Sequence, residues 1–231
     1  MTSLSLGIRT IVLMAVAVTG TSTSSHAETS EERRARFIAS NAAQVAAFQE
    51  TDIQAPVRPG SVIFTGSSSI RMWDIENSFP GEGYVNRGFG GSTIPGSIRY
   101  IDALVIEHKP RLVVFYSGDN DIAVGRPAET VLSDFSYFVG HIHHELPNAR
   151  IVVISIKPSI ARWDKIEEIR RANKLIQEWT TMVDHVDYVD IHDAMLGSDG
   201  KPDPDLLLDD GLHLTAAGYA IWNAALAPYL H

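Results

Sequence analysis

The chain contains no cysteine among its 231 residues. This absence excludes disulfide bonds and metal sites built on thiolates. The fold must therefore be held together by a packed core alone, and about 200 residues are enough for one domain with such a core. The sequence beyond its N-terminal region also has no internal repeat and no low-complexity segment.

The chain also lacks an apolar run long enough to cross a membrane. Its N-terminal run, "TIVLMAVAV", covers residues 10–18, well below the roughly 20 residues that a span needs. Arg9 precedes this run, and Ser25-His26-Ala27 fits a small-x-small cleavage site. The arrangement predicts a secretory signal peptide at residues 1–27. We expect a chain exported to the periplasm or secreted, without stable membrane insertion and without a lipobox anchor.

Basic residues are scarce relative to acidic ones. The chain has 19 Lys and Arg against 28 Asp and Glu, a net charge of −9. Cleavage after Ala27 removes Arg9 and no acidic residue, which leaves −10 on residues 28–231. An acidic surface disfavours nucleic acid and anionic membranes as partners. The charge indicates plain solubility rather than a cationic substrate.

Apolar runs and amphipathic segments alternate along the rest of the chain. The stretch from Thr29 to Glu32 is typical of a helix cap and predicts a helical extension within residues 28–55. Continuous apolar runs predict buried strands at residues 61–66, 83–86, 111–118, 150–156 and 186–191. Apolar residues at helical spacing predict helices near residues 95–105, 127–142, 166–179 and 215–226.

Strands that alternate with helices predict an α/β fold, with a parallel five-stranded sheet covered on both faces in one domain over residues 28–231. In such sheets the functional site lies at the carboxyl ends of the strands. Four polar or glycine-rich clusters follow the expected strands: Gly66-Ser67-Ser68-Ser69, "NRGFGGST" (86–93), "SGDND" (117–121) and "DDGLH" (209–213).

Each cluster has an ordinary structural explanation when it is taken alone. Serines after a strand cap helices, and "GDND" is rich in turn-forming residues. The "GFGG" stretch is an incomplete dinucleotide fingerprint, because Thr93 stands at its third glycine position. "DDGLH" is compatible with a solvated loop before a helix that Thr215 caps. The functional argument therefore depends on the clusters acting together.

Together the clusters supply every part that a serine ester hydrolase needs: a nucleophile, a base, a carboxylate that orients the base, and donors for the oxyanion. Asp210 and His213 are three residues apart, so one turn of chain can bring the carboxylate to the imidazole. Gly91 can offer an unobstructed backbone N–H, and Asn120 a side-chain amide. Ser68 can add its own backbone N–H at a helix start.

These clusters resemble the four blocks of the SGNH/GDSL hydrolase superfamily, in the same order and at matching spacing. The blocks read Gly66-Ser67-Ser68, Gly91 within "NRGFGGST", Gly118-Asp119-Asn120-Asp121, and Asp210-Gly211-Leu212-His213. The resemblance covers about residues 60–228. It implies a flavodoxin-like three-layer α/β/α sandwich, which agrees with the independent reading of strands and helices.

The resemblance also implies a role for each matching residue. Ser68 would be the nucleophile, His213 the general base and then the acid, and Asp210 the carboxylate that orients His213. The backbone N–H groups of Ser68 and Gly91 and the side chain of Asn120 would form the oxyanion hole. No metal or cofactor is implied.

One position departs from the family pattern. The family has an aspartate before its nucleophile, and this chain has Ser67 there. Because that aspartate is outside the triad, the change need not abolish the chemistry, but it leaves Ser67 and Ser69 as alternative nucleophiles. Asp209 is likewise an alternative to Asp210, although only Asp210 has the Asp-x-x-His spacing.

A different hydrolase fold can be rejected on the same residues. An α/β-hydrolase also orders its triad as Ser, Asp and His. It requires Gly-x-Ser-x-Gly, and Ile70 occupies the last of those positions. Its acid and histidine also usually come from separate loops rather than from one four-residue motif.

Other segments have weaker functional interpretations. In "HIHHE" (141–145), His141 and His144 could share a helix face and bind a metal, but histidines also suit a helix C-terminus. The "SDGKPDPD" loop (198–205) has acidic spacing like that of a calcium loop, but its prolines and missing glutamate favour a positioning loop. Side chains expected near the rim of the site are Trp73, Lys157, Ser159 and Trp163, although for the tryptophans packing is the commoner role.

The sequence therefore predicts an exported hydrolase of carboxylic esters that acts on a small-molecule or glycan ester. The resemblance covers lipases, lysophospholipases, thioesterases and carbohydrate acetylesterases, and the absence of a long apolar lid favours small acyl or acetyl groups. Two alternatives remain: O-acyl transfer to a glycan by the same triad, and a non-catalytic glycan-binding module. The sequence does not indicate an oligomeric state.

Overall fold

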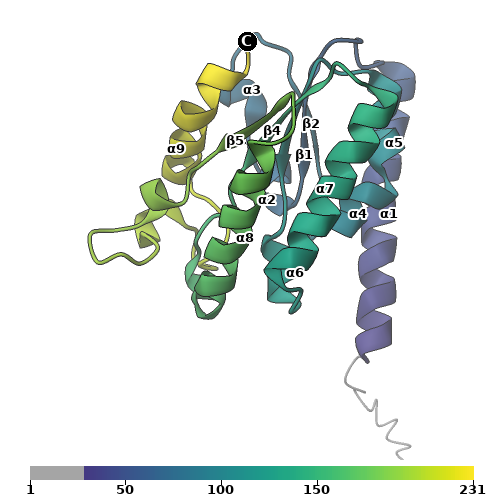
Figure 1. Cartoon of the computed structure of the whole chain (residues 1–231). Coiled ribbons are helices and arrows are strands. Elements are labelled where there is room, and N and C mark those ends of the chain that lie inside the picture. Colours follow the sequence, from purple (N-terminus) through teal and green to yellow (C-terminus); the bar gives the residue numbers. More distant parts are fainter. Residues whose placement is uncertain (1–28) are drawn as a thin grey trace, which may run out of the picture.

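The computed structural model describes residues 29–231 and contains a five-stranded parallel sheet covered by helices on both faces (Figure 1). The strand order is β2-β1-β3-β4-β5. The strands are β1 (Val62–Gly66), β2 (Val85–Gly88), β3 (Leu112–Tyr116), β4 (Arg150–Ile154) and β5 (Val186–Val189). All neighbouring pairs are parallel, as the sequence predicts, so every strand's carboxyl end lies at one edge of the sheet.

Helices account for most of the remaining structure. The α-helices are α1 (Ser30–Gln54), α2 (Ser68–Arg71), α3 (Ile75–Ser78), α4 (Ile94–Arg99), α5 (Ile101–Leu104), α6 (Asp119–Ala123), α7 (Ala128–Glu145), α8 (Ile166–Thr180) and α9 (Ala216–Leu226). Short 3-10 turns are η1 (Ile106–His108), η2 (Ile160–Lys165), η3 (Asp193–Met195), η4 (Pro204–Leu206) and η5 (Ala227–Tyr229).

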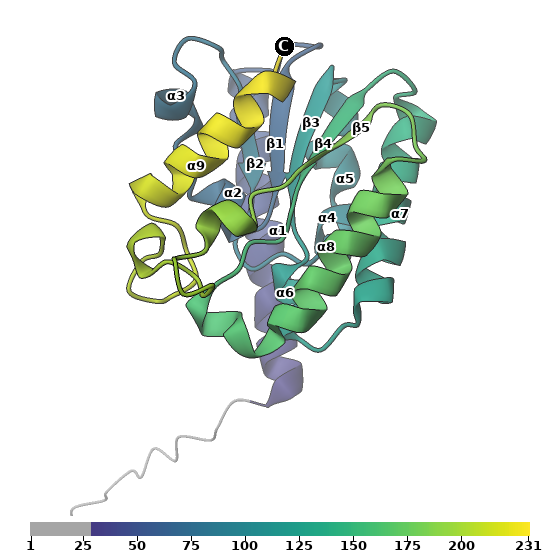
Figure 2. The ribbon, with the colours of Figure 1, turned by 60° about the vertical axis from the view of Figure 1, so that its left-hand side comes forward.

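The sheet separates two apolar cores, because successive strand residues point to opposite faces. On one face, Val113 and Phe115 of β3 pack with the buried sides of α7 and α8. On the other, Val114 and Tyr116 pack with α2 and α9. Figure 2 shows these two helical layers on either side of the strands. The predicted three-layer α/β/α sandwich is confirmed.

The helix predicted near residues 95–105 differs from the observed structure. It is divided into α4, α5 and the turn η1, with Tyr100 between α4 and α5 at φ −114° and ψ 16°. Gly96 and Ser97 lie inside α4, and both are poor helix formers, so little intrinsic propensity opposes the break. Apolar spacing alone predicted a continuous helix because the buried positions keep helical spacing across the break. Helix α4 buries Ile94, and α5 buries Ile101 and Leu104.

Helix α1 is attached to the sheet by specific contacts. Val45 joins the core that contains α7 and α8. The buried Arg87 of β2 forms an ion pair with Asp52 and lies over the Phe48 ring, 5.0 Å from its centroid. Gln44 Oε1 accepts a 2.8 Å hydrogen bond from the Gly90 N–H. The helical extension therefore reaches the loop after β2, where Gly91 lies.

Two expectations concern the N-terminal region and membranes. The predicted signal peptide, residues 1–27, lies outside the described residues. Within residues 29–231, no helix is both long enough and apolar enough to span a bilayer.

Candidate active site

The turn that carries Ser68 follows β1 directly. Gly66 has φ 133°, and a Cβ there would lie 1.9 Å from the Tyr116 carbonyl oxygen, so only glycine fits beside β3. The Ser67 N–H donates to that same oxygen at 3.0 Å. Ser68 is then the first residue of α2. The glycine and the pairing of β1 with β3 thus hold Ser68 at the carboxyl edge of the sheet.

The structure brings Ser68, His213 and Asp210 into one hydrogen-bonded chain. His213 Nε2 lies 2.9 Å from Ser68 Oγ, and His213 Nδ1 lies 2.5 Å from Asp210 Oδ2. The other carboxylate oxygen of Asp210 accepts the N–H groups of Leu212 and His213, each at 2.9 Å. Asp210, rather than Asp209, therefore holds the imidazole.

The ionisation of Asp210 defines the tautomer of His213. The hydrogen bond from the His213 ring, helped by the two backbone N–H groups, lowers the pKa of Asp210 to about 2. An ionised carboxylate only accepts hydrogen bonds, so His213 Nδ1 must donate. In the neutral imidazole, Nε2 then carries the lone pair and accepts the Ser68 hydroxyl. This is the arrangement that proton removal from Ser68 requires.

The neighbouring serines do not share this geometry. The side chains of Ser67 and Ser69 are fully buried, and the Ser67 hydroxyl has no hydrogen-bond partner within the described residues. Only Ser68 of the three is hydrogen-bonded to a histidine.

Three candidate donors come from the segments that follow β1, β2 and β3. Gly91 has φ 68°, in the left-handed region that favours glycine. Among the described residues, the backbone N–H groups of Gly91 and Ser68 have no acceptor. Asn120 Nδ2 donates to the Ser92 carbonyl at 2.9 Å, which leaves its second hydrogen available. Donors of this kind can stabilise an oxyanion.

A cluster of charged side chains is joined to Asn120 through Arg162. Arg162 Nη2 donates to Asn120 Oδ1 at 2.7 Å, and Arg162 Nη1 lies 2.8 Å from Asp119 Oδ2. Lys157 Nζ lies 3.5 Å from the same Asp119 oxygen and 3.3 Å from the Tyr116 hydroxyl. Burial lowers the pKa of Lys157 and raises that of Tyr116. Arg162 and Lys157 thus share the carboxylate of Asp119, and the guanidinium of Arg162 keeps a positive charge beside Asn120.

These contacts correct the sequence prediction for the rim. Lys157, Ser159 and Trp73 are buried rather than at a rim, with Trp73 donating from Nε1 to Ser78 and Asn223. Trp163 is half-buried against the core that contains α7 and α8. Sequence reasoning missed Arg162, which lies in the irregular turn η2 with no motif around it.

Asp121 fixes α6 against α4. Its carboxylate accepts the Ile94 N–H at 3.1 and 3.3 Å and lies 3.5 Å from Arg126 Nε. Complete burial raises the pKa of this carboxyl to about 7, although the Ile94 N–H and the charge of Arg126 oppose the shift. Asp121 thereby holds Asn120 next to the loop that carries Gly91.

The segments weighed for metals have other contacts. His141 Nε2 lies 3.6 Å from Asp102 Oδ1, and His144 Nε2 lies 3.7 Å from Glu145 Oε1. In the loop at 198–205, Asp203 caps η4. No group of three or more His, Asp or Glu side chains in residues 29–231 is arranged to hold a metal.

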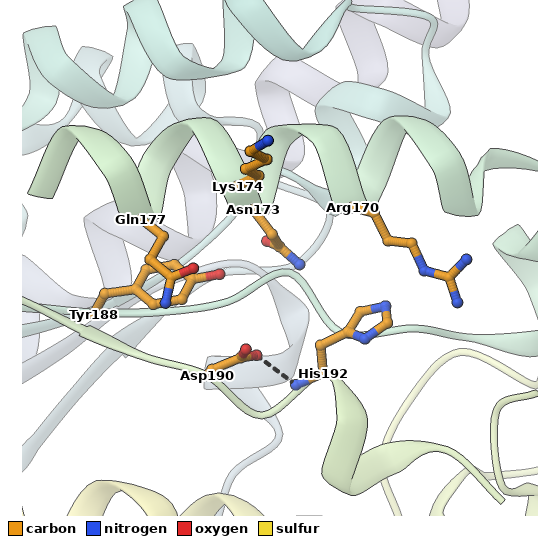
Figure 3. Close-up of a pocket in the computed structure, with 7 residues that line it drawn as sticks. All are labelled: Arg170, Asn173, Lys174, Gln177, Tyr188, Asp190 and His192. Carbon is orange, nitrogen blue, oxygen red and sulfur yellow. Dashed lines mark hydrogen bonds between the residues drawn. The ribbon is translucent and has the colours of Figure 1, made fainter. Parts of the chain in front are cut away.

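A separate small hollow of about 160 Å³ lies between α8 and β5 (Figure 3). Its lining residues are Arg170, Asn173, Lys174, Gln177, Tyr188, Asp190 and His192. His192 Nδ1 contacts Asp193 at 2.9 Å, and Asp190 accepts the His192 N–H. β5 is an outermost strand of the sheet, two strands away from β3. This hollow is therefore distinct from the site at Ser68.

The fold is an α/β/α sandwich, and the sequence family assigns the chain to the hydrolases. The chain belongs to the GDSL-like lipase/acylhydrolase family, whose sequence model matches residues 70–221. Gly91, Asn120, Asp210 and His213 fall inside the match, which begins two residues after Ser68. The resemblance noted from the sequence is confirmed at the level of the family. No curated protein matches the chain.

Solved structures with the same fold come from several organisms. A protein of Streptococcus pneumoniae has a TM-score of 0.78 and 21% identity, over 87% of this chain and 97% of its own. A GDSL-like lipase of Bacteroides thetaiotaomicron has a TM-score of 0.69 and 21% identity, over 80% and 98%. A family 3 carbohydrate esterase of Talaromyces cellulolyticus has a TM-score of 0.59 and 20% identity, over 74% and 95%. At these identities the likeness concerns the fold alone.

Proposed function

We propose that the protein hydrolyses carboxylic esters of small acyl groups with Ser68 as the nucleophile. The observation that carries this proposal is the continuous chain of hydrogen bonds from Ser68 Oγ through His213 to Asp210. It lies at the carboxyl edge of a parallel sheet, which is where such folds place their sites. Membership of an acylhydrolase family agrees with it.

In the proposed reaction, Ser68 Oγ attacks the ester carbonyl carbon as His213 Nε2 takes its proton. The carbonyl oxygen becomes an oxyanion and accepts hydrogen bonds from the N–H groups of Ser68 and Gly91 and from Asn120 Nδ2. The alcohol then leaves with the proton from His213, and the acyl group stays on Ser68. A water that gives its proton to His213 attacks this acyl-enzyme and releases the acid.

The acyl group is proposed to be small, and the substrate to be a small-molecule or glycan ester. No long apolar lid occurs in the sequence. One structure with the same fold is described as a carbohydrate esterase. The proposed partner is thus a small-molecule or glycan ester, outside the cytoplasm if the signal peptide acts as the sequence predicts. Transfer of the acyl group to a sugar instead of water would use the same steps up to the acyl-enzyme.

Ser68→Ala provides the test, with para-nitrophenyl acetate as substrate. We expect kcat to fall at least about 10³-fold, because truncating the nucleophile removes the covalent route. Ser67→Ala is the matched control, since its hydroxyl has no partner within the described residues, and it should keep nearly normal turnover. Circular dichroism checks that both variants are folded. Near-wild-type turnover by Ser68→Ala would refute the assignment, and product diverted to an added xylo-oligosaccharide would favour the transferase.

A further inference from the structure

A second cavity, of about 510 Å³, lies between α1, α4 and the end of α6. Its lining residues are Ile38, Asn41, Thr93, Pro95, Gly96, Arg99, Tyr100, Val124 and Arg126. Figure 1 shows α1 running beside α5 and α4 and continuing past them on the side of the loops that follow the strands. The volume is within the range of small-molecule sites.

Two residues that line the cavity are close neighbours, along the chain, of the proposed oxyanion donors. Thr93 is two residues after Gly91, so their Cα atoms are within about 7 Å. Val124 follows Asn120 by one turn of α6, roughly 6 Å along the helix. A molecule in this cavity would therefore lie close to an ester carbonyl held by Gly91 and Asn120.

The wall of the cavity contains an unsatisfied buried acceptor. Asn41 is 4% exposed, and its Oδ1 has no hydrogen-bond partner within the described residues. A buried carbonyl oxygen without a donor costs about 1–3 kcal/mol. A ligand that brings an O–H group would recover this cost. Neither a hydrocarbon chain nor an anion such as sulfate has a donor to offer.

The charges of the wall also argue against an anion site. Arg126 is already paired with the carboxylate of Asp134. Arg99 is exposed and has no acidic partner among the described residues, so it can donate to neutral oxygens. A fatty acyl chain would instead strip water from Arg99 without replacing it.

The remaining walls suit the apolar face of a sugar ring. The Tyr100 ring is held edge to face by Phe89, with ring centroids 6.1 Å apart. Ile38, Pro95 and Val124 add apolar surface. Fixed aromatic and apolar surface, together with a few polar groups, is the usual composition of a specific ligand pocket.

We propose that this cavity binds a sugar unit of the acylated glycan while its ester lies at Ser68. The inference rests on the proposed function and narrows its substrate to a hydroxyl-rich ester. It assigns the acceptor role to Asn41, the donor role to Arg99 and the ring contact to Tyr100. Helix α1, which lies entirely before the residues matched by the family model, becomes part of the substrate site.

The kinetic experiment compares acetylated xylo-oligosaccharides with para-nitrophenyl acetate. Asn41→Leu and Arg99→Ala should each lower the ratio of kcat/KM for the glycan to kcat/KM for the nitrophenyl ester about tenfold, mainly through KM. Val124→Trp, at a residue 71% exposed, should lower it further by filling the cavity. Matched controls are Arg58→Ala and Met182→Trp, exposed residues outside the cavity lining.

A binding experiment separates this inference from the proposed function. Ser68→Ala protein is titrated with xylohexaose by calorimetry, alone and combined with Val124→Trp. Binding that Val124→Trp abolishes would support the cavity even if wild-type protein hydrolysed no ester. Unchanged substrate ratios in all three cavity variants would overturn the inference. A changed preference for acyl-chain length at an unchanged glycan ratio would overturn it too, since the cavity would then hold the acyl group.

Discussion

At the scale of single residues, Asn120 is fixed in one orientation by its two neighbours. Arg162 can only donate, so it must face Asn120 Oδ1, and the Ser92 carbonyl can only accept, so it must face Nδ2. Rotating the amide by half a turn would set N–H groups against the guanidinium. The free hydrogen of Nδ2 is therefore held in place before any substrate binds, which is the condition for electrostatic stabilisation of an oxyanion.

This geometry predicts that Arg162→Ala lowers kcat for para-nitrophenyl acetate by about 10–100-fold with little change in KM. Loss of the guanidinium frees the Asn120 amide to turn and removes a positive charge below the oxyanion. Arg162→Lys should recover part of kcat, since it restores one donor and the charge. Steady-state kinetics on purified variants check this, with exposed Arg170→Ala as the control. A rise in KM alone would contradict a positioning role.

The residues that the sequence identified as candidates and those that it missed differ in whether a local motif or tertiary packing sets their position. Ser68, Gly91, Asn120 and His213 could be put forward as candidates because each falls at a set place after a strand or in a short motif. Arg162 was not, because its partner Asn120 is 42 residues away and only the packing of η2 beside α6 joins them. Lys157 was placed wrongly for a similar reason, since a lysine after a strand normally reaches solvent.

At the scale of elements, the strands were predicted well and the short helices poorly. Buried strands of a parallel sheet are continuous apolar runs, and β1, β3 and β4 each fall inside such a run. The one-turn helices α2, α3 and α6 have too few residues for a period to show. Their limits are fixed by tertiary contacts, such as the Asp121 bond to Ile94 that joins α6 to α4.

The burial of Asp121 predicts an unusual pH dependence of stability. Asp121 has a pKa of about 7 in the folded chain and about 3.9 in the unfolded chain. Between these two pH values the folded state keeps the proton and the unfolded state has lost it. Stability from this group is complete below about pH 4 and is lost as the pH rises through about 7. The loss is up to roughly 4 kcal/mol.

The variant Asp121→Asn isolates this effect. The asparagine stays neutral and its oxygen can still accept the Ile94 N–H. We expect the variant to become more stable relative to wild type, with a rising difference in the free energy of unfolding, between about pH 5 and about pH 8. Urea unfolding at several pH values measures the difference, with exposed Asp164→Asn as the control. A difference that does not change with pH would contradict the raised pKa.

Helix α1 offers a second prediction at this scale. Arg87 and Asp52 have only 5% and 17% exposed side chains, so Asp52→Ala leaves a buried guanidinium without its partner. We expect a loss of about 3 kcal/mol in the free energy of unfolding. The double variant Asp52→Leu with Arg87→Met should lose less, because both charges are gone. Chemical denaturation checks this against exposed Glu50→Ala on the same helix, and equal losses in all three would contradict a buried pair.

At the scale of the whole molecule, alternation of strands and helices predicted the sandwich, but not which helix covers which face. That choice follows from strand order, since placing β1 between β2 and β3 puts Ser68 next to β3 and within reach of the loop that carries His213. A motif order along the chain cannot encode this proximity. It needs the sheet to bring residues 145 positions apart to one edge.

Export is the remaining expectation at this scale, and we propose that the chain is cleaved after Ala27. The described structure begins at residue 29 and α1 at Ser30, so cleavage there keeps every residue that the structure describes. A chain without cysteine needs no oxidative step to fold. Expression of the full chain in a bacterium should give a periplasmic protein whose first residue, by N-terminal sequencing, is Glu28. Ala27→Leu should block processing, because the site requires a small residue there, while His26→Gln at the tolerant middle position should not. A first residue inside α1, or equal processing of both variants, would contradict the proposed site.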